Sequence, residues 1–199
     1  MQNAAYKVPL AYVLIPRPTV LRQAMLVLGA TAFVALSAQV RFGLPFTPVP
    51  VTGQTFAVLL TGALLGSRLG AVSLSSYWVV GACGLPVFNR WGSGWAVAGG
   101  PTGGYIVGFI IAAFVVGWFA ERGWDRGRWV IVPLLIGNVI LYIPGLLWLA
   151  RFVGPHAVLQ AGLWPFLPGD LLKLVAAAVV LPAGWTVVDA LNSDRSRSR

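Results

Sequence analysis

The chain has 199 residues, of which 58% are hydrophobic and 10% are charged, whereas a soluble domain carries roughly 25% charged residues. This composition excludes an ordinary water-soluble protein and indicates an integral membrane protein. The formal net charge is +9, but the basic residues are scattered between apolar runs and form no stripe interleaved with aromatic residues. We therefore expect a lipid bilayer, and no nucleic acid, as the surrounding partner. The single cysteine, Cys83, precludes an intramolecular disulfide.

Six apolar segments follow one another along the chain, at residues 24–40, 54–66, 69–88, 102–120, 129–150 and 170–188. A helix needs roughly 20 residues to span a hydrocarbon core of about 30 Å, so segment 54–66 is short and the other five suffice. The sequence predicts an all-α integral membrane protein with six transmembrane helices in a single bundle, forming one membrane domain over residues 1–199. The basic tail, residues 192–199, is polar and we expect it to be disordered.

The basic residues also predict the orientation of the bundle, because cytoplasmic loops are enriched in Lys and Arg. With six spans and a cytoplasmic N-terminus, ten basic residues face the cytoplasm, and Arg41, Arg90 and Arg151 face outward. Both termini are therefore predicted to be cytoplasmic. The first segment could instead be a cleavable signal, since Ala35-Leu36-Ser37 resembles a cleavage site. Its removal would leave five spans and weaken the charge asymmetry.

The charged pair Asp170 and Lys173 is the first candidate for a binding site. Both residues lie at the outer end of the last segment, and their three-residue spacing places them on one helical face. Ionisable residues within membrane helices indicate function by default. A simpler interpretation is that Asp170 caps the helix while Lys173 extends toward the interface.

Two long outer loops supply the remaining candidates. Residues 42–54 alternate prolines with apolar and hydroxyl residues, which predicts a stiff flap over a pocket, and this loop ends at Gln54. Residues 84–95 contain Asn89, which can donate and accept hydrogen bonds, and Arg90, which could pair with a carboxylate. Tyr105 follows the glycine-rich residues 99–104 and could form an apolar wall. Ordinary turn, solvated and interfacial roles remain open for these side chains.

Two other classes of function are weighed against ligand capture. An enzyme would need a nucleophile and a base, but the single histidine, His156, lies in an outer loop without a catalytic motif. A channel or a membrane scaffold would place polar residues along several helices, whereas here they cluster at one end. We expect neither a cofactor nor a bound metal.

Several motifs, in order along the chain, closely resemble the BioY family. They are residues 44–55 (LPFTPVPVTGQT), residues 62–66 (GALLG) followed by Arg68-Leu69-Gly70, residues 84–88 (GLPVF), residues 100–105 (GPTGGY) with Gly108-Phe109, and Pro168-Gly169-Asp170 with Lys173. The resemblance implies a biotin-specific S component of an energy-coupling factor (ECF) transporter. Such a component is a six-helix bundle that captures biotin from outside and works with a transmembrane T component and two ABC-type ATPases.

The resemblance also implies roles for individual residues. Asp170 and Lys173 match the family's Asp and Lys at the start of the last helix, and Asn89 lies where the family has a polar loop contact. Asp170 would accept from the ureido nitrogens of biotin, while Lys173 would bond a biotin oxygen or hold Asp170 ionised. The chain has no P-loop, so ATP hydrolysis would come from partner subunits. A solitary biotin transporter without ATPases, and an S component for another small vitamin, remain alternatives.

The resemblance further implies that the first helix packs on the T component through small residues four positions apart. Thr31 with Ala35 is the one clear pair of this kind here. This departure from the family pattern leaves the mode of docking open.

Overall fold

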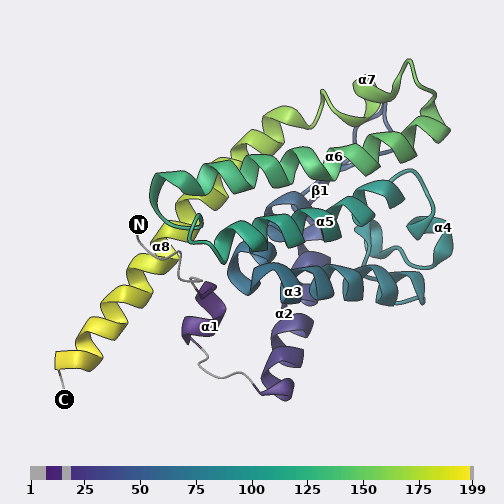
Figure 1. Ribbon diagram of the computed structural model, residues 1–199. Helices are drawn as coiled ribbons and strands as arrows, with labels where there is room; N and C mark the ends of the chain where they lie inside the picture. Colours follow the sequence, from purple (N-terminus) through teal and green to yellow (C-terminus); the bar gives the residue numbers. More distant parts are fainter. Residues whose placement is uncertain (1–7, 15–18, 198–199) are drawn as a thin grey trace.

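The computed structural model describes residues 8–14 and 19–197, which form a mostly helical bundle that includes a two-stranded sheet (Figure 1). Strands β1 and β2 pair antiparallel, with Arg41 opposite Thr52 and Phe42 opposite Val51. The flap predicted at residues 42–54 is therefore a short hairpin. In chain order the elements are α1 (Leu10–Leu14), α2 (Val20–Gln39), β1 (Arg41–Phe42), β2 (Val51–Thr52), α3 (Gln54–Ala82), η1 (Asn89–Trp91), α4 (Trp95–Ala98), α5 (Gly103–Ala120), η2 (Gly127–Val130), α6 (Ile131–Val153), α7 (Val158–Gly162) and α8 (Leu167–Arg197).

Five helical stretches in the described part of the chain are long and apolar enough to cross a membrane. They are Val20–Gln39, Gln54–Ala82, Gly103–Ala120, Gly127–Val153 and Val158–Ala190. The predicted class, a helical protein that crosses the membrane several times, is therefore confirmed. Six separate spans are not confirmed, because the predicted segments at 54–66 and 69–88 both belong to α3.

Helix α3 reverses direction near Gly66. Gly66 has φ 82° and ψ 179°, which is not helical, and a positive φ of this kind is readily adopted by glycine. A Cβ at Gly70 would lie 3.1 Å from the Cα of Gly62, although eight residues of straight helix would separate them by about 12 Å. The chain therefore folds back on itself within α3. The first arm, residues 54–66, is too short to cross the hydrocarbon alone. It is largely buried by the rest of the protein, which is the condition for irregular backbone at membrane depth.

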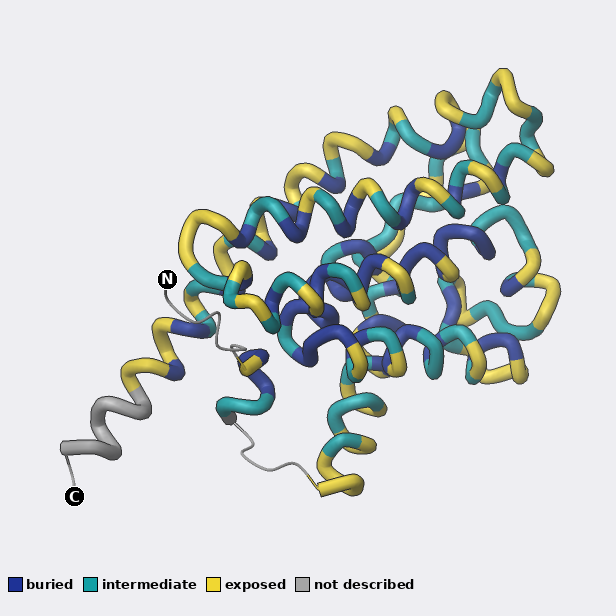
Figure 2. Tube along the Cα trace, in the orientation of Figure 1, coloured by how far each residue is buried: buried dark blue, intermediate teal, exposed yellow. Residues whose placement is uncertain are grey.

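Helices α3, α5 and α6 form the buried centre of the bundle, and Figure 2 shows α3 and α5 largely in the colour of buried residues. Glycines on α5 allow this close packing. A Cβ at Gly108 would lie 2.9 Å from the Cα of Leu141 on α6, and a Cβ at Gly117 would approach the backbone of Gly66 and Ser67 more closely still. Backbone therefore packs against backbone on both sides of α5.

Helix α2, the first of the candidate spans, packs on α3. Thr31 donates a hydrogen bond of 3.0 Å from its hydroxyl to the carbonyl of Ser73, and Ala35 is also buried. Thr31 and Ala35, the small residues expected to pack against a T component, therefore face α3 of the same chain. Any docking on α2 would have to use other residues.

One end of the bundle, which we call the basic end, carries Arg68, Arg122, Arg126 and Arg128. There Glu121 accepts hydrogen bonds of 2.8 Å from both the backbone N–H and the hydroxyl of Ser67, which holds the turn of α3. Helices α1 and α8 meet there too, since Leu10 packs with Trp185 and Arg126 stacks on Trp185. Assignment of this end to the cytoplasm remains a prediction. The disorder expected in the tail is wrong for residues 192–197, because α8 continues to Arg197.

Candidate ligand-binding pocket

A pocket of about 570 Å³, including space at its mouth, lies among α3, α5, α6 and α8 at the end opposite the basic end. Five of the six predicted site residues line it: Gln54, Asn89, Tyr105, Asp170 and Lys173. The other lining residues are Val49, Pro50, Thr52, Thr55, Tyr77, Phe88, Thr102, Ile106, Phe109, Leu141, Tyr142 and Phe166.

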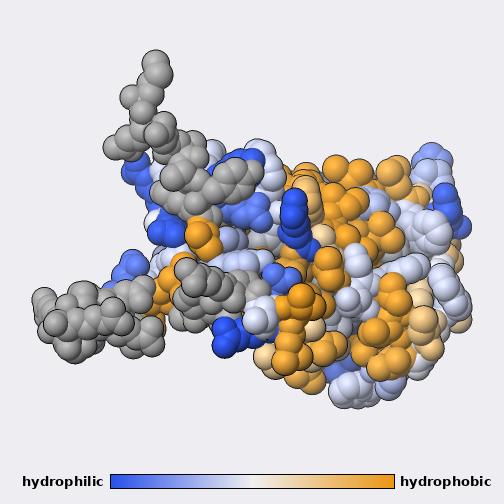
Figure 3. All heavy atoms as spheres, turned by 60° about the horizontal axis from the view of Figure 1, so that its bottom comes forward, coloured by the Kyte–Doolittle hydropathy of each residue, from blue (hydrophilic) through white to orange (hydrophobic). Residues whose placement is uncertain are grey.

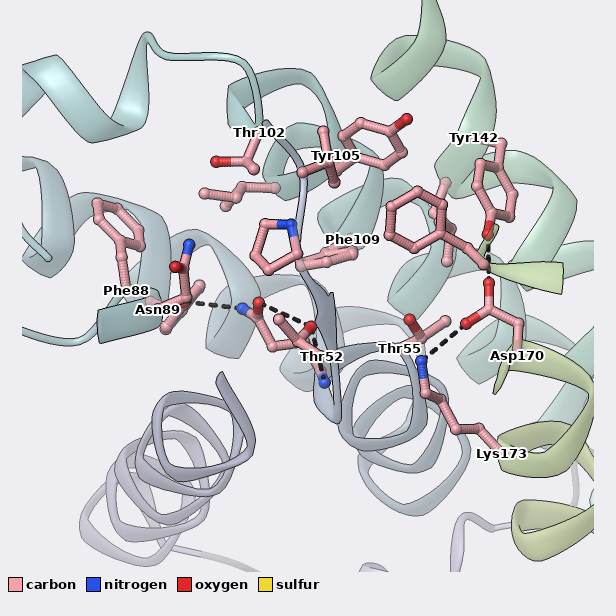
Figure 4. Close-up of a pocket in the computed structure, with 17 residues that line it drawn as sticks. Thr52, Thr55, Phe88, Asn89, Thr102, Tyr105, Phe109, Tyr142, Asp170 and Lys173 are labelled. Atoms are coloured by element: carbon pink, nitrogen blue, oxygen red, sulfur yellow. Dashed lines mark hydrogen bonds and ion pairs between the residues drawn. The ribbon is translucent and has the colours of Figure 1, made fainter. Parts of the chain in front are cut away.

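Asp170 and Lys173 form the ionic side of the pocket (Figure 4). Asp170 lies in the first turn of α8 and is 3% exposed. Lys173 donates a 2.9 Å hydrogen bond from Nζ to Oδ1 of Asp170, and the hydroxyl of Tyr142 donates to Oδ2. Lys173 therefore turns toward the carboxylate and does not extend to the interface. Each carboxylate oxygen has a second lone-pair site, so Asp170 can still accept from a ligand.

Gln54 belongs to a second polar group on the arms of α3. Its Nε2 donates a 2.8 Å bond to the hydroxyl of Tyr77, and its Oε1 accepts a 3.2 Å bond from the hydroxyl of Thr52. Within the described residues, no acceptor is found for the hydroxyl hydrogen of Tyr77. Because Tyr77 lines the pocket, this hydrogen is available to a ligand oxygen.

Asn89 lies on the other side of the pocket from Asp170 (Figure 4). Gln39 of α2 holds this loop by donating a 3.0 Å bond to the carbonyl of Phe88 and accepting a 3.1 Å bond from the N–H of Trp91. Arg90 and Trp91 have φ values of 60° and 56°. Left-handed backbone is costly for such side chains and is commonly found at functional sites.

Arg90 is the one predicted site residue that does not line the pocket. It lines an adjacent hollow of about 590 Å³ together with residues of the β1–β2 loop. Asn89 and Pro50 line both spaces, so Arg90 is placed near the mouth. Thr47 of the same loop donates a 2.6 Å hydrogen bond to the carbonyl of Ala161, which fastens the loop to α7.

Tyr105 contributes mainly its ring. Its hydroxyl donates a 2.8 Å bond to the carbonyl of Gly162 on α7, and its ring meets that of Tyr142 edge to face, with 6.1 Å between centroids. The sequence reasoning missed Tyr142 and Tyr77. Both are tyrosines within apolar segments, and this could have drawn attention to them, since a buried tyrosine hydroxyl needs a hydrogen-bond partner.

The fold and pocket together define a multi-pass membrane protein with a partly open, mostly apolar site that has charged and hydrogen-bonding groups on opposing sides. Residues 6–190 match the BioY family, and the chain belongs to that family.

Individual relatives agree with this assignment. A probable biotin transporter BioY from Pyrococcus horikoshii is 40% identical over 149 residues, covering 74% of this chain and 88% of that protein. The biotin transporter BioY from Thermotoga maritima is 38% identical over 151 residues, covering 75% and 88%. The fold is similar to that of a crystal structure of the S-component for biotin from an ECF-type ABC transporter, with a TM-score of 0.74 and 24% identity. The similarity covers 82% of this chain and 90% of that chain.

Proposed function

We propose that this protein captures biotin with high affinity and takes it up across the cytoplasmic membrane as the S component of an ECF transporter. Membership of the BioY family and the biotin transporters among its relatives support this function. Energy for uptake comes from a partner T component and two ABC-type ATPases.

The observation that carries the proposal is the pairing of Asp170 and Lys173 on one side of an apolar pocket, with polar side chains opposite. Biotin has a ureido ring with two N–H donors and one carbonyl, an apolar thioether ring and a valerate carboxylate. Asp170 accepts from a ureido N–H, while Asn89 and Tyr77 donate to the ureido carbonyl. Lys173 stays hydrogen-bonded to the other side of the Asp170 carboxylate.

The rest of the pocket suits the apolar part of the ligand. Phe88, Phe109 and Phe166, which are nearly fully buried, surround the thioether ring together with the ring of Tyr105. Gln54 holds Tyr77 in place, and Arg90 at the mouth meets the valerate carboxylate. This division places apolar atoms against apolar walls and gives partners to one ureido N–H, the ureido carbonyl and the valerate carboxylate.

Equilibrium binding of labelled biotin to the purified chain tests the ligand. We expect one biotin per chain, and we expect Asp170→Asn to raise the Kd roughly 10-fold to 150-fold, because a hydrogen bond to a charged group contributes about 1.5–3 kcal/mol. Asp189→Asn is the matched control, since Asp189 is exposed on the same helix. The proposal fails if biotin does not saturate the protein, if another vitamin displaces it at lower concentration, or if the two variants behave alike.

Uptake of labelled biotin into cells tests the energising partners. Cells that lack their own biotin uptake would express this chain with or without a T component and an ATPase pair. We expect accumulation against a gradient only with the partners, and it should stop when the ATPases carry an inactive P-loop. Equal accumulation without partners would establish a solitary transporter.

A further inference from the structure

An apolar groove separate from the ligand pocket runs along the surface between α2 and α8. It encloses about 1,070 Å³, including its open side. Thr52 and Lys173 line both the groove and the pocket and so form the wall between them. The groove is lined by Phe33, Ser37, Val40, Arg41, Phe42, Val51, Thr52, Gly53, Phe56, Leu172, Lys173 and Ala176.

The groove opens onto the surface that faces the hydrocarbon of the membrane. Val40, Phe42 and Leu172 on its walls are 71%, 67% and 71% exposed, and α2 and α8 both belong to candidate spans. Residues 33, 37 and 40 repeat at helical spacing, so the groove follows one face of α2 for about 10 Å. Figure 3 shows apolar residues gathered across the middle of the molecule, with hydrophilic residues toward its ends. Acyl chains are therefore the molecules that meet this groove.

Arg41 gives the groove a charged end. It lies on β1, directly after α2, and is exposed. Its side chain makes no ion pair with any residue that the structure describes. Lys173, the other cation of the groove, is already paired with Asp170. A phosphate is the complementary group for a free guanidinium, which can bind it with two parallel hydrogen bonds.

We propose that the groove binds one phospholipid, with an acyl chain between α2 and α8 and its phosphate at Arg41. The apolar walls and the single free cation at one end match the two parts of such a lipid. Ala176 on α8 has a small side chain that leaves this space open. Apart from Lys173 and Thr52, which form the shared wall, the groove is built from residues outside the biotin pocket.

Native mass spectrometry of the full-length chain tests the proposal. The protein is stripped of lipid in a neutral detergent and titrated with dioleoyl phosphatidylglycerol or with dioleoylglycerol, which lacks the phosphate. We expect one phosphatidylglycerol to bind about five-fold more tightly than dioleoylglycerol, since an exposed ion pair contributes up to about 1 kcal/mol. Arg41→Gln should remove that difference and leave binding of dioleoylglycerol unchanged.

A second pair of variants tests the position of the acyl chain. Ala176→Phe fills the groove and should abolish the saturable binding event, whereas Ala24→Phe, at an exposed site on α2 outside the groove, should preserve it. Circular dichroism would verify that both variants are folded. The absence of saturable lipid binding, equal effects of the two variants, or a dimer that Ala176→Phe disrupts would each overturn the proposal. Biotin plays no part in the assay, so its outcome is independent of the proposed transport function.

Discussion

The ion pair between Asp170 and Lys173 should contribute measurably to stability as well as to binding. At 2.9 Å between Nζ and Oδ1, the Coulomb attraction at an effective dielectric constant of about 20 is about 6 kcal/mol before desolvation. The side chains are 3% and 17% exposed, so desolvation offsets much of that attraction. An exposed pair would contribute about 0–1 kcal/mol. We expect a net coupling of about 2 kcal/mol.

A double-mutant cycle isolates this coupling. Lys173→Met alone should lower the free energy of unfolding by about 3 kcal/mol, because it leaves a buried carboxylate with Tyr142 as its described partner. In the Asp170→Asn background the same change should cost about 1 kcal/mol, since no charge is left unpaired. Methionine keeps most of the apolar length of lysine, so the cycle reports mainly on charge.

Unfolding in mixed micelles by sodium dodecyl sulfate, followed by circular dichroism without biotin, provides the four free energies. Asp189→Asn, at an exposed position of α8, is the control and should couple to Lys173→Met by less than about 0.3 kcal/mol. A coupling below about 0.5 kcal/mol for the Asp170 cycle would refute the reasoning. The pair would then behave as an exposed one despite its burial.

Three further predictions test packing, the loop and the mouth of the pocket. Gly108→Val should prevent the protein from eluting as a single monodisperse peak in size-exclusion chromatography, because its Cβ would lie 2.9 Å from a backbone Cα of α6. Gly29→Val is the control and should be tolerated, because a Cβ at Gly29 would have nothing within 4 Å. Thr47→Val should speed biotin dissociation about five-fold in pulse-chase binding, because it removes the 2.6 Å hydrogen bond between the β1–β2 loop and α7. An unchanged dissociation rate would show that this hydrogen bond does not help the loop to retain biotin. Arg90→Ala should raise the Kd for biotin by at most about five-fold and leave that for biotin methyl ester unchanged, because this arginine is exposed.

The sequence could single out Asp170 and Lys173 because a buried charge in a membrane is costly and therefore conspicuous. Asp170 and Lys173 could be placed on one helical face from their spacing alone. Tyr77 and Tyr142 could not be assigned, because a phenol in an apolar segment packs well in any membrane helix. Only the convergence of α3, α6 and α8 brings their hydroxyls to Gln54 and Asp170.

The count of six spans was not confirmed, for a different reason. A hydropathy profile separates two spans where a polar loop interrupts the apolar residues. The backbone N–H and C=O groups of such a loop are usually satisfied by residues of the loop itself. At the reversal of α3 the backbone N–H of Ser67 is instead satisfied by Glu121, which lies 54 positions later in the chain. Gly66 supplies the turn, and the hydroxyl of Ser67 also donates to Glu121. The local sequence therefore carries too weak a signal to show whether residues 54–66 cross the membrane.

The pocket joins the buried centre of the bundle to a helix that is much less buried. In the most apolar window of each span, 72% of residues are buried for α3 and 61% for α5, but only 28% for the span that contains α8. Asp170 and Lys173 lie on α8, whereas Tyr77 and Tyr105 lie on the buried helices α3 and α5. A ligand that bridges the two sides should therefore tie α8 to the centre.

Hydrogen exchange of the purified chain with and without biotin measures this effect. We expect the amides of residues 167–176 to exchange at least about five-fold more slowly with biotin, because each bridging hydrogen bond contributes about 1 kcal/mol against local opening. The amides of α5 are already protected by close backbone packing on both sides and should change little. Equal slowing in α5 and α8, or none in α8, would show that the ligand does not act by joining these two parts.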